Sequence, residues 1–424
     1  MTTSALKQMV GFGLTMVVLG ATTLMAIPAL VRSGGASAWS AIAVGQSVGA
    51  LGAVVLAYGW VISGPADVAR MDAMGRRMEY FESLRARFVL CFPVLVVSGV
   101  VSLLVARNDQ ALAALGSVTT AAIGMTSSWY FVGTGEPYRL LLFETLPRAA
   151  GTVAGIVLME AGSSPAVGLV CQIVGLAIGV AGASAFVLRR RRKSDGPRRA
   201  RSVTTILVDQ RHGVATSAWG TLYSVLPIAI VGWVASPVLV QYAVLDKLQK
   251  QASSGLSPLV QVLQGWVPRA KPQNIGIRAV RAAVAAIAIG FSITLALILV
   301  GRPIVTWLGD GRVHVSLLSI SLLAGTVALA LVGSVISKAS LVSLGLISLV
   351  SRLTMWTSMF GLLLVALLGW RYGLDGALVG LLCGSACRCG LLLTVLILKC
   401  RESASFSSEF KGLPSLDGKH VDVL

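Results

Sequence analysis

A small group of charged residues interrupts an otherwise apolar stretch, QYAVLDKLQKQASSGLSP, which extends from Gln241 to Pro258. Asp246, Lys247 and Lys250 lie near its middle, where a charged side chain inside a membrane is costly. An ammonium group held away from water favours an anionic partner, so both lysines are candidate ligands for an anionic substrate. Asp246 precedes Lys250 by four residues and could also neutralise it within one helix.

Several polar residues around the lysines share one face of a helix. Spacings of three and four residues bring together Tyr242, Asp246, Gln249, Lys250, Ser253 and Ser257. This stripe predicts a substrate-binding face turned to a water-filled cavity, with Asp246 restraining a lysine between binding events. The alternative is an Asp246–Lys250 ion pair that only neutralises both groups, while Lys247 extends toward a membrane interface.

Two further pairs with helical spacing are candidate site residues. Glu144 and Arg148 could gate the inner mouth of a cavity, or could form an ordinary interfacial ion pair. Trp219 and Tyr223 share a helix face and could stack against a substrate, or could simply pack against neighbouring helices.

The amino-acid composition indicates whether these residues lie in a soluble protein or in a membrane protein. Of 424 residues, 55% are apolar and 12% are charged, with a mean hydropathy of +0.83, whereas soluble chains carry about 25% charged residues. The sequence therefore predicts an all-α, polytopic membrane protein. Twelve apolar runs approach the length of about 20 residues that crosses a bilayer. They are Met9–Val31, Ala38–Ser63, Phe88–Ala106, Ala111–Phe131, Leu140–Glu160, Pro165–Leu188, Val214–Ser236, Val238–Trp266, Val280–Val300, Val315–Ile336, Thr354–Trp370 and Gly376–Leu398.

The basic residues indicate the orientation of these spans. With both termini in the cytoplasm, most of the 35 Lys and Arg residues fall on the cytoplasmic face, including Lys338 and Arg388. The opposite face receives only Arg32, Arg107, Arg302, Arg312 and Arg371, and Lys247 and Lys250 are left within a span. The positive-inside rule thus favours an N-in, C-in protein, and explains the net charge of +18 without nucleic acid.

A basic run divides the chain into two halves. RRRRKSDGPRRAR, which begins at Arg189, separates six spans from six. It is typical of a cytoplasmic topology determinant that contacts anionic lipids, although a DNA or heparin patch is the alternative. The predicted domains are 1–188 and 206–399, each a six-helix lobe, with a basic cytoplasmic linker at 189–205. Residues 400–424 form a polar tail that is predicted to be disordered. Corresponding spans begin about 200 residues apart, as in the parallel repeats of transporters.

Signatures of enzymes and metal sites are missing from the sequence. The three His residues are isolated, and no H-E-x-x-H, G-x-S-x-G or P-loop spacing occurs. Cys383 and Cys387 could share a helix face, but no His or acidic residue accompanies them. We therefore expect neither an enzyme nor a metal site, and no cofactor. The identity of any coupling ion stays open.

Three motifs carry a resemblance to a known family. The first, YGWVISGPADVAR, ends the second span with Gly64 and Pro65, and the second, SSWYFVGTGEPYRLLLFETLPR, forms the turn between spans four and five. The third is SPVLVQYAVLDKLQKQASSGLSPLVQVLQGWVPR, around span eight. With these motifs the chain resembles the Wzx-type polysaccharide and O-antigen repeat-unit flippases of the multidrug/oligosaccharidyl-lipid/polysaccharide (MOP) exporter superfamily.

The resemblance implies a fold and a function. It implies twelve transmembrane helices in two six-helix lobes around a central cavity, as in MATE transporters of the same superfamily. The expected activity is alternating-access transfer of an undecaprenyl-diphosphate-linked oligosaccharide from the cytoplasmic to the outer leaflet of a bacterial cell membrane. The alternative is a MATE-like antiporter of small molecules or cations on the same fold.

The same resemblance suggests partners. We expect the lipid-linked oligosaccharide and anionic membrane lipids to bind, nucleic acid not to bind, and the protein to be a monomer. A polysaccharide polymerase and other assembly proteins are further candidate partners.

Overall fold

The computed structural model describes residues 3–106, 108–189, 201–270, 274–308 and 315–411. Every regular element in these ranges is helical. The first half contains α1 (Thr3–Ala57), α2 (Gly64–Arg70), α3 (Ala73–Val105), α4 (Gln110–Ala122), α5 (Ser128–Thr134), α6 (Pro137–Leu140), α7 (Leu146–Glu160) and α8 (Pro165–Arg189). The second half contains α9 (Val203–Val234), α10 (Leu239–Trp266), α11 (Ile275–Leu308), α12 (Leu317–Ser334) and α13 (Ile347–Lys411). Two π-helical segments, η2 (Leu141–Thr145) and η5 (Val335–Leu341), connect α6 to α7 and extend α12.

The number of membrane-length helices agrees with the prediction from apolar runs. Ten helices in the described ranges are long and apolar enough to cross a membrane, and the last of them is sharply broken at Gly373, where φ is 61°. The helix α10 has the necessary length but is less apolar because of its polar stripe. Counting the two parts of the last helix and α10 gives the twelve expected spans. The predicted all-α, twelve-helix fold is confirmed.

Several helices extend beyond the predicted apolar runs. The basic segment before span three is continuous with it, so that α3 begins at Ala73, where Asp72 caps it by accepting a hydrogen bond from the Gly75 amide. The fourth run is instead interrupted after Ala122, and its last turn becomes α5. Hydropathy detects only the part of a helix that lies in lipid, and it cannot detect helical turns outside the membrane.

The linker and the tail differ in how much of them the structure describes. Most of the basic linker, residues 190–200, lies outside the described residues, as do residues 412–424 of the tail. The first part of the tail is helical, since α13 continues to Lys411.

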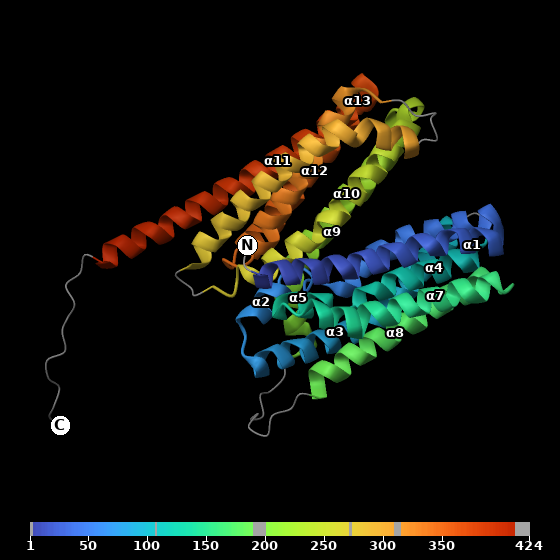
Figure 1. Cartoon of the computed structure of the whole chain (residues 1–424), viewed down its shortest axis with the longest axis horizontal. Helices are drawn as coiled ribbons and strands as arrows, with labels where there is room; N and C mark the ends of the chain where they lie inside the picture. Colours follow the sequence, from blue (N-terminus) through green and yellow to red (C-terminus); the bar gives the residue numbers. More distant parts are fainter. Residues whose placement is uncertain (1–2, 107, 190–200, 271–273, 309–314, 412–424) are drawn as a thin grey trace.

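The helices form two lobes that meet at one end and diverge at the other (Figure 1). In the first lobe, α1 packs on α3, α4 and α7, and α7 packs on α8; in the second, α13 packs on α9 and α12. Contacts between the lobes join α9 and α10 to α1, α2, α3 and α5. We refer to the end where α2 and α5 lie as the closed end, and to the diverging end as the open end.

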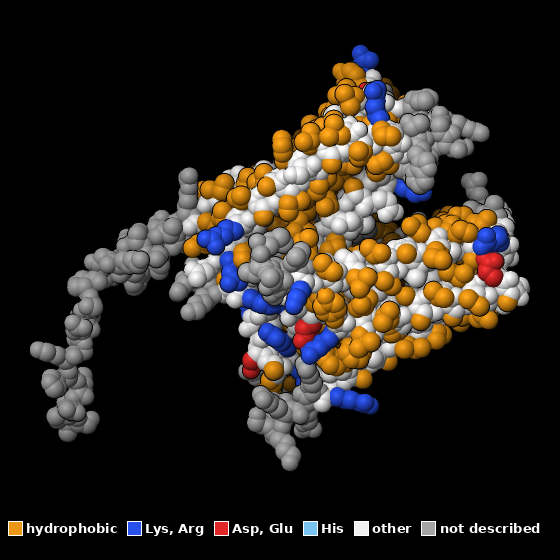
Figure 2. Space-filling view, viewed as in Figure 1, with side chains coloured by type: hydrophobic (Ala, Val, Ile, Leu, Met, Phe, Trp, Pro, Cys, Tyr) orange, Lys and Arg blue, Asp and Glu red, His pale blue; other side chains and the backbone are white. Residues whose placement is uncertain are grey.

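Side-chain chemistry distinguishes the outer surface from the closed end. Apolar side chains cover the visible flanks of both lobes, whereas many of the visible Lys and Arg residues gather around the closed end (Figure 2). Large apolar residues are exposed on several helices, among them Phe92, Leu104, Phe291 and Leu299. Apolar surface of this extent is typical of contact with lipid.

The two motifs of the first lobe meet at the closed end. Gly64 lies directly beneath the ring of Trp129, and a side chain at Gly133 would collide with Pro65 and Val68. Glycine at these positions therefore lets α2 and α5 approach each other closely. The packing of α5 on α2 places Trp129 at the boundary with the second lobe.

Helix packing in the first lobe depends on Gly45. A Cβ atom at this position would overlap the carbonyl group of Ala113 on α4. We expect Gly45→Ala to destabilise the protein by about 1–3 kcal/mol, because the close packing of α1 on α4 must open. Thermal melting in detergent should show a lowered midpoint. Gly20→Ala is the matched control, since nothing lies within 4 Å of the added Cβ on the same helix, and an equal drop in both variants would contradict this explanation.

Candidate functional site

Three adjoining cavities lie between the lobes. Their volumes are about 160, 500 and 580 Å³, and all three are lined by Ser224 of α9 and Ser334 of α12. Residues of the first lobe, among them Val61 and Trp129, line these cavities. In the second lobe, α10, η5 and α13 also contribute lining residues. Because the cavities share lining residues, we treat them as one central cavity.

The polar stripe of α10 faces this cavity. The predicted residues Tyr242, Asp246, Gln249, Lys250 and Ser253 all line the smallest of the three cavities, and Ser257 lines the one of about 500 Å³. Spacings of three and four residues position these side chains on one face of a regular helix. The stripe is thus directed away from lipid.

Asp246 and Lys250 form an ion pair at the cavity wall. The Lys250 Nζ atom donates a hydrogen bond to Asp246 Oδ2 over 2.6 Å. The Lys250 side chain is nevertheless 43% exposed, whereas that of Asp246 is 12% exposed. The two interpretations of this pair are therefore compatible, since Lys250 contacts Asp246 and also faces the cavity.

Lys247 and Trp219 have different surroundings from the other predicted ligands. Lys247 is exposed and is not among the residues that line the three cavities. Trp219 is also outside these lining sets, although Tyr223, one turn later, lines the smallest cavity. The Tyr223 hydroxyl donates to the Leu381 carbonyl over 2.9 Å, and this bond links α9 to α13.

The structure brings two further cations to the cavity. Lys338 of η5 lines the two larger cavities, and Arg388 of α13 lines the smallest and the largest. Neither forms an ion pair with a residue that the structure describes, and the Nε atom of Arg388 is buried without a hydrogen-bond partner. Among the residues that the structure describes, the lining of the central cavity therefore carries Lys250, Lys338 and Arg388 against the single carboxylate of Asp246.

Lys338 and Arg388, which positive-inside counting assigned to the cytoplasmic face, lie in the lining of the central cavity. Both lie within helices long enough to span a membrane, as do Arg87 and Arg148. Arg148 and Arg388 also lie inside the apolar runs predicted from the sequence, so Lys247 and Lys250 are not the only basic residues there. Positive-inside counting assumes that a basic residue near a span end faces water, and it does not test whether that water is inside the protein. The signal available in the sequence was the position of Arg388 twelve residues inside its predicted apolar run.

Glu144 and Arg148, the predicted gate, lie within the first lobe. Glu144 is 2% exposed, and its Oε2 atom accepts a hydrogen bond from the Ser127 amide over 2.9 Å. Its backbone packs against Gly179 of α8. Neither residue lines the central cavity as described above. The contacts of Glu144 link η2 to the α4–α5 turn and to α8.

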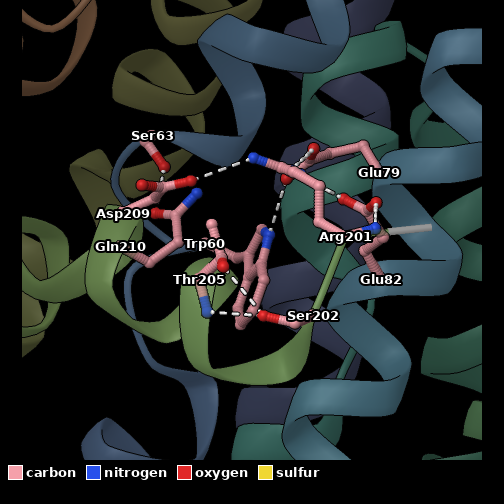
Figure 3. A network of polar contacts seen from close by, with 9 residues as sticks. All are labelled: Trp60, Ser63, Glu79, Glu82, Arg201, Ser202, Thr205, Asp209 and Gln210. Carbon is pink, nitrogen blue, oxygen red and sulfur yellow. Dashed lines mark hydrogen bonds and ion pairs between the residues drawn. The ribbon is translucent and has the colours of Figure 1, made fainter. Parts of the chain in front are cut away.

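An arginine at the start of α9 connects the lobes at the closed end (Figure 3). The Arg201 guanidinium contacts Glu79 Oε2 at 2.9 Å and Glu82 Oε2 at 2.7 Å on α3, and Asp209 Oδ2 at 3.2 Å on α9. The Arg201 amide also donates to Glu82 Oε1, and Trp60 Nε1 donates to Glu79 Oε1. Arg201 therefore neutralises two carboxylates that are almost fully buried.

Other interlobe contacts surround this network. The Ser63 hydroxyl donates to Gln210 Oε1 over 2.7 Å (Figure 3), and Arg269 donates to the Gly133 carbonyl over 2.6 Å. Arg70 of α2 donates to the Ser343 carbonyl of the second lobe. We call Arg201, Glu79 and Glu82, with the contacts of Arg70 and Arg269, the closed-end latch.

Asp67 lies beside the latch and has an unusual proton affinity. Partial burial and the nearby Glu79 raise its pKa to about 6, against 3.8 in an exposed chain, although Arg70, Ser63 and Arg201 oppose the shift. The folded protein therefore holds a proton more tightly than the unfolded chain between about pH 4 and 6.

This shift predicts a loss of stability as the pH rises through that window. Well below pH 4, the Asp67 carboxyl group is protonated in both the folded and the unfolded protein. Above pH 6, the folded protein must hold Asp67 as a poorly hydrated carboxylate, which lowers the free energy of unfolding. Because only about one pH unit of this window lies above pH 5, we expect Asp67→Asn to remove about 1.4 kcal/mol of the pH dependence between pH 5 and pH 7.5. Melting curves at pH 5 and pH 7.5 would measure it, and the same change with pH in both proteins would exclude the role of Asp67.

Comparison with known proteins gives matches in structure alone. No protein-family model and no curated protein matches this sequence. The chain is similar to an outward-facing multidrug resistance MATE family transporter of the MOP superfamily, with a TM-score of 0.71, 15% identity and coverage of 95% of this chain and 96% of the other. The chain is also similar to a MATE transporter in complex with MaD3S, with a TM-score of 0.69 and 14% identity. This match covers 94% of this chain and 97% of the other.

A third similar structure is a MOP superfamily transporter from Pyrococcus furiosus. Its TM-score is 0.71 at 13% identity, with coverage of 95% of this chain and 96% of the other. For that protein, a binding pocket of reverse polarity has been taken to suggest a different function. Together these similarities show that the chain has the fold of MATE transporters of the MOP superfamily.

Proposed function

We propose that this protein is a flippase that moves a diphosphate-linked oligosaccharide lipid across a bacterial cell membrane by alternating access. The observation that carries the proposal is the convergence of Lys250, Lys338 and Arg388 on one cavity whose described lining has a single acidic residue. The resemblance of the motifs to Wzx-type flippases supplies undecaprenyl diphosphate as the lipid carrier.

The charge of the cavity supports an anionic substrate. A diphosphate loses its hydration when it leaves the membrane surface, and transfer through hydrocarbon without compensation is prohibitive. Fixed cations in a water-filled cavity offset part of that loss, and hydrogen bonds to charged groups contribute about 1.5–3 kcal/mol each. Lys338 and Arg388 can compensate for the lost hydration of a diphosphate more fully than Lys250 can, because neither is paired with a described carboxylate.

The arrangement of the lobes supports alternating access. The cavity lies between lobes that are latched at one end and diverge at the other (Figure 1). Since basic residues gather at the closed end (Figure 2), the positive-inside rule assigns that end to the cytoplasm and makes the state outward-facing. N-in and C-in termini follow from the same assignment, because α1 begins and α13 ends on that side (Figure 1). Anionic lipids would then contact the basic end.

A MATE-like cation antiporter is the second candidate. The fold and the acidic residue Asp246 in the cavity lining favour it. However, Lys250 already neutralises Asp246, and the remaining cations repel a cationic substrate.

Reconstitution in liposomes distinguishes the two candidates. Transfer of an undecaprenyl-diphosphate-linked disaccharide between leaflets and uptake of ethidium, a cationic dye, would be measured with the same preparation. We expect transfer of the lipid and no uptake of the dye. Lys250→Gln should slow transfer about tenfold through loss of a charged hydrogen bond, while the matched control Lys247→Gln should have little effect. Uptake of the dye without transfer of the lipid would establish the antiporter instead.

A further inference from the structure

The polar stripe of α10 continues past Ser257 toward the closed end. Gln261 and Gln264 follow at spacings of four and three residues, and both line the cavity of about 500 Å³ together with Trp129 of α5. Lys250 and Lys338 line the same cavity. Its volume falls within the range of roughly 300–1,000 Å³ that is typical of small-molecule sites.

Three polar atoms of this wall lack hydrogen-bond partners among the described residues. They are the Nε2 atom of Gln264, the Oε1 atom of Gln261 and the Nε1 atom of Trp129. Gln264 is 6% exposed and Trp129 is 3% exposed, so both side chains are almost entirely removed from bulk water. Buried polar groups are nearly always paired in folded proteins. All three residues line one cavity, where a ligand with both hydrogen-bond donors and acceptors could supply the partners that these groups lack.

The indole ring of Trp129 is held in a fixed position. It stacks on Tyr80 with a centroid separation of 6.1 Å, and Gly64 also lies against the ring. The Tyr80 hydroxyl is itself anchored by Ser127 at 2.8 Å and Ser184 at 3.0 Å. The indole N–H is thus preorganised, which lowers the entropy lost when a ligand binds.

We propose that Gln261, Gln264 and Trp129 form a sugar subsite, which binds the neutral glycan while Lys250, Lys338 and Arg388 bind the diphosphate. This inference rests on the proposed function, and it adds that the cavity has one part for the sugar and another part for the diphosphate. Side-chain amides donate and accept hydrogen bonds and an indole N–H donates, which matches the hydroxyl groups of a sugar. The described lining of this cavity contains no carboxylate, and its cations are confined to Lys250 and Lys338.

The length of the stripe agrees with an extended headgroup. At 1.5 Å per residue, Gln261 lies roughly 16 Å and Gln264 roughly 21 Å from Lys250 along α10. A compact anion cannot contact both ends of the stripe. A headgroup with an anionic part and a neutral part can.

The test compares two probes on protein in lipid nanodiscs. The probes are undecaprenyl diphosphate without sugar and undecaprenyl-diphosphate-linked N-acetylglucosamine, and the measurement is the dissociation constant of each. We expect the wild type to bind the glycosylated lipid more tightly. In Gln261→Leu/Gln264→Leu that preference should fall about tenfold through the loss of two hydrogen bonds, with binding of the bare diphosphate unchanged.

Matched variants separate the subsite from general effects. Gln251→Leu makes the same substitution on an exposed position of α10 outside the described lining, and it should keep the preference. Trp129→Phe keeps a ring but removes the N–H, and should lose part of the preference. Equal binding of both probes by the wild type would overturn the sugar subsite and leave the proposed function intact. Binding of neither probe would overturn the proposed function and this inference together.

Discussion

Lys338→Met/Arg388→Met is expected to slow transfer of a diphosphate-linked lipid roughly a hundredfold or more in liposomes. Each cation can contribute about 1.5–3 kcal/mol through charged hydrogen bonds, and a loss of about 2.7 kcal/mol corresponds to a factor of roughly 100. Methionine retains much of the volume and flexibility of both side chains, so the change is mainly one of charge.

Stability distinguishes a binding role from a structural role in this variant. Neither cation has an acidic partner among the described residues, and the Nε atom of Arg388 is unpaired. Removing unpaired, partly buried charges should leave the melting temperature unchanged or raise it. Arg352→Met is the matched control, because Arg352 is exposed on the same helix as Arg388. A lower melting temperature together with undiminished transfer would assign these cations to structure.

Arg201→Met is expected to shift the population of the two lobe arrangements roughly thirtyfold toward the form that is open at the latched end. Without Arg201, Glu79 and Glu82 would remain with side chains 6% and 4% exposed and without their charged partner. Loss of one partner of a buried pair costs about 3–5 kcal/mol, and because Arg201 is itself 43% exposed we reduce this to about 2 kcal/mol. That free energy corresponds to a factor of about 30.

Distances between spin labels would measure the shift. Labels at Ser164→Cys, on the α7–α8 turn, and at Tyr372→Cys, beside the break in α13, report the separation of the lobes after the six native cysteines are replaced. We expect shorter distances in Arg201→Met than in the parent. Arg211→Met, an exposed arginine on the same helix, should leave the distribution unchanged. An unchanged distribution in Arg201→Met would show that the latch does not hold this state.

The stripe on α10 could be predicted because it depends on local geometry. Residues three and four apart share a helix face in any fold, so Asp246, Lys250 and Ser253 were brought together correctly by spacing alone. The direction of the stripe also follows from the cost of exposing such groups to lipid. Its partners could not be predicted in this way, because Lys338 and Arg388 come from helices about 90 and 140 residues further along the chain.

The predicted gate of Glu144 and Arg148 also shows that helical spacing cannot predict tertiary neighbours. Glu144 and Arg148 have the spacing of an intrahelical pair, but spacing does not specify which neighbour that helix faces. The structure packs Glu144 against Ser127 and α8, inside the first lobe. The structure has an interlobe ion pair at Arg201. In the sequence, Arg201 is one of many arginines in a basic run, and nothing there distinguishes it from the others.

The sequence by itself determined the all-helical membrane fold, the number of spans and the polar face of α10, because hydropathy and helical spacing are local properties of the chain. Only the tertiary structure decided which cations share a cavity, which carboxylates are latched across the lobes, and which polar atoms remain unpaired. Those outcomes depend on the packing of helices far apart in sequence, such as α5 against α10 and α9 against α13. The physical reason is that the effect of a buried charge depends on what surrounds it in three dimensions.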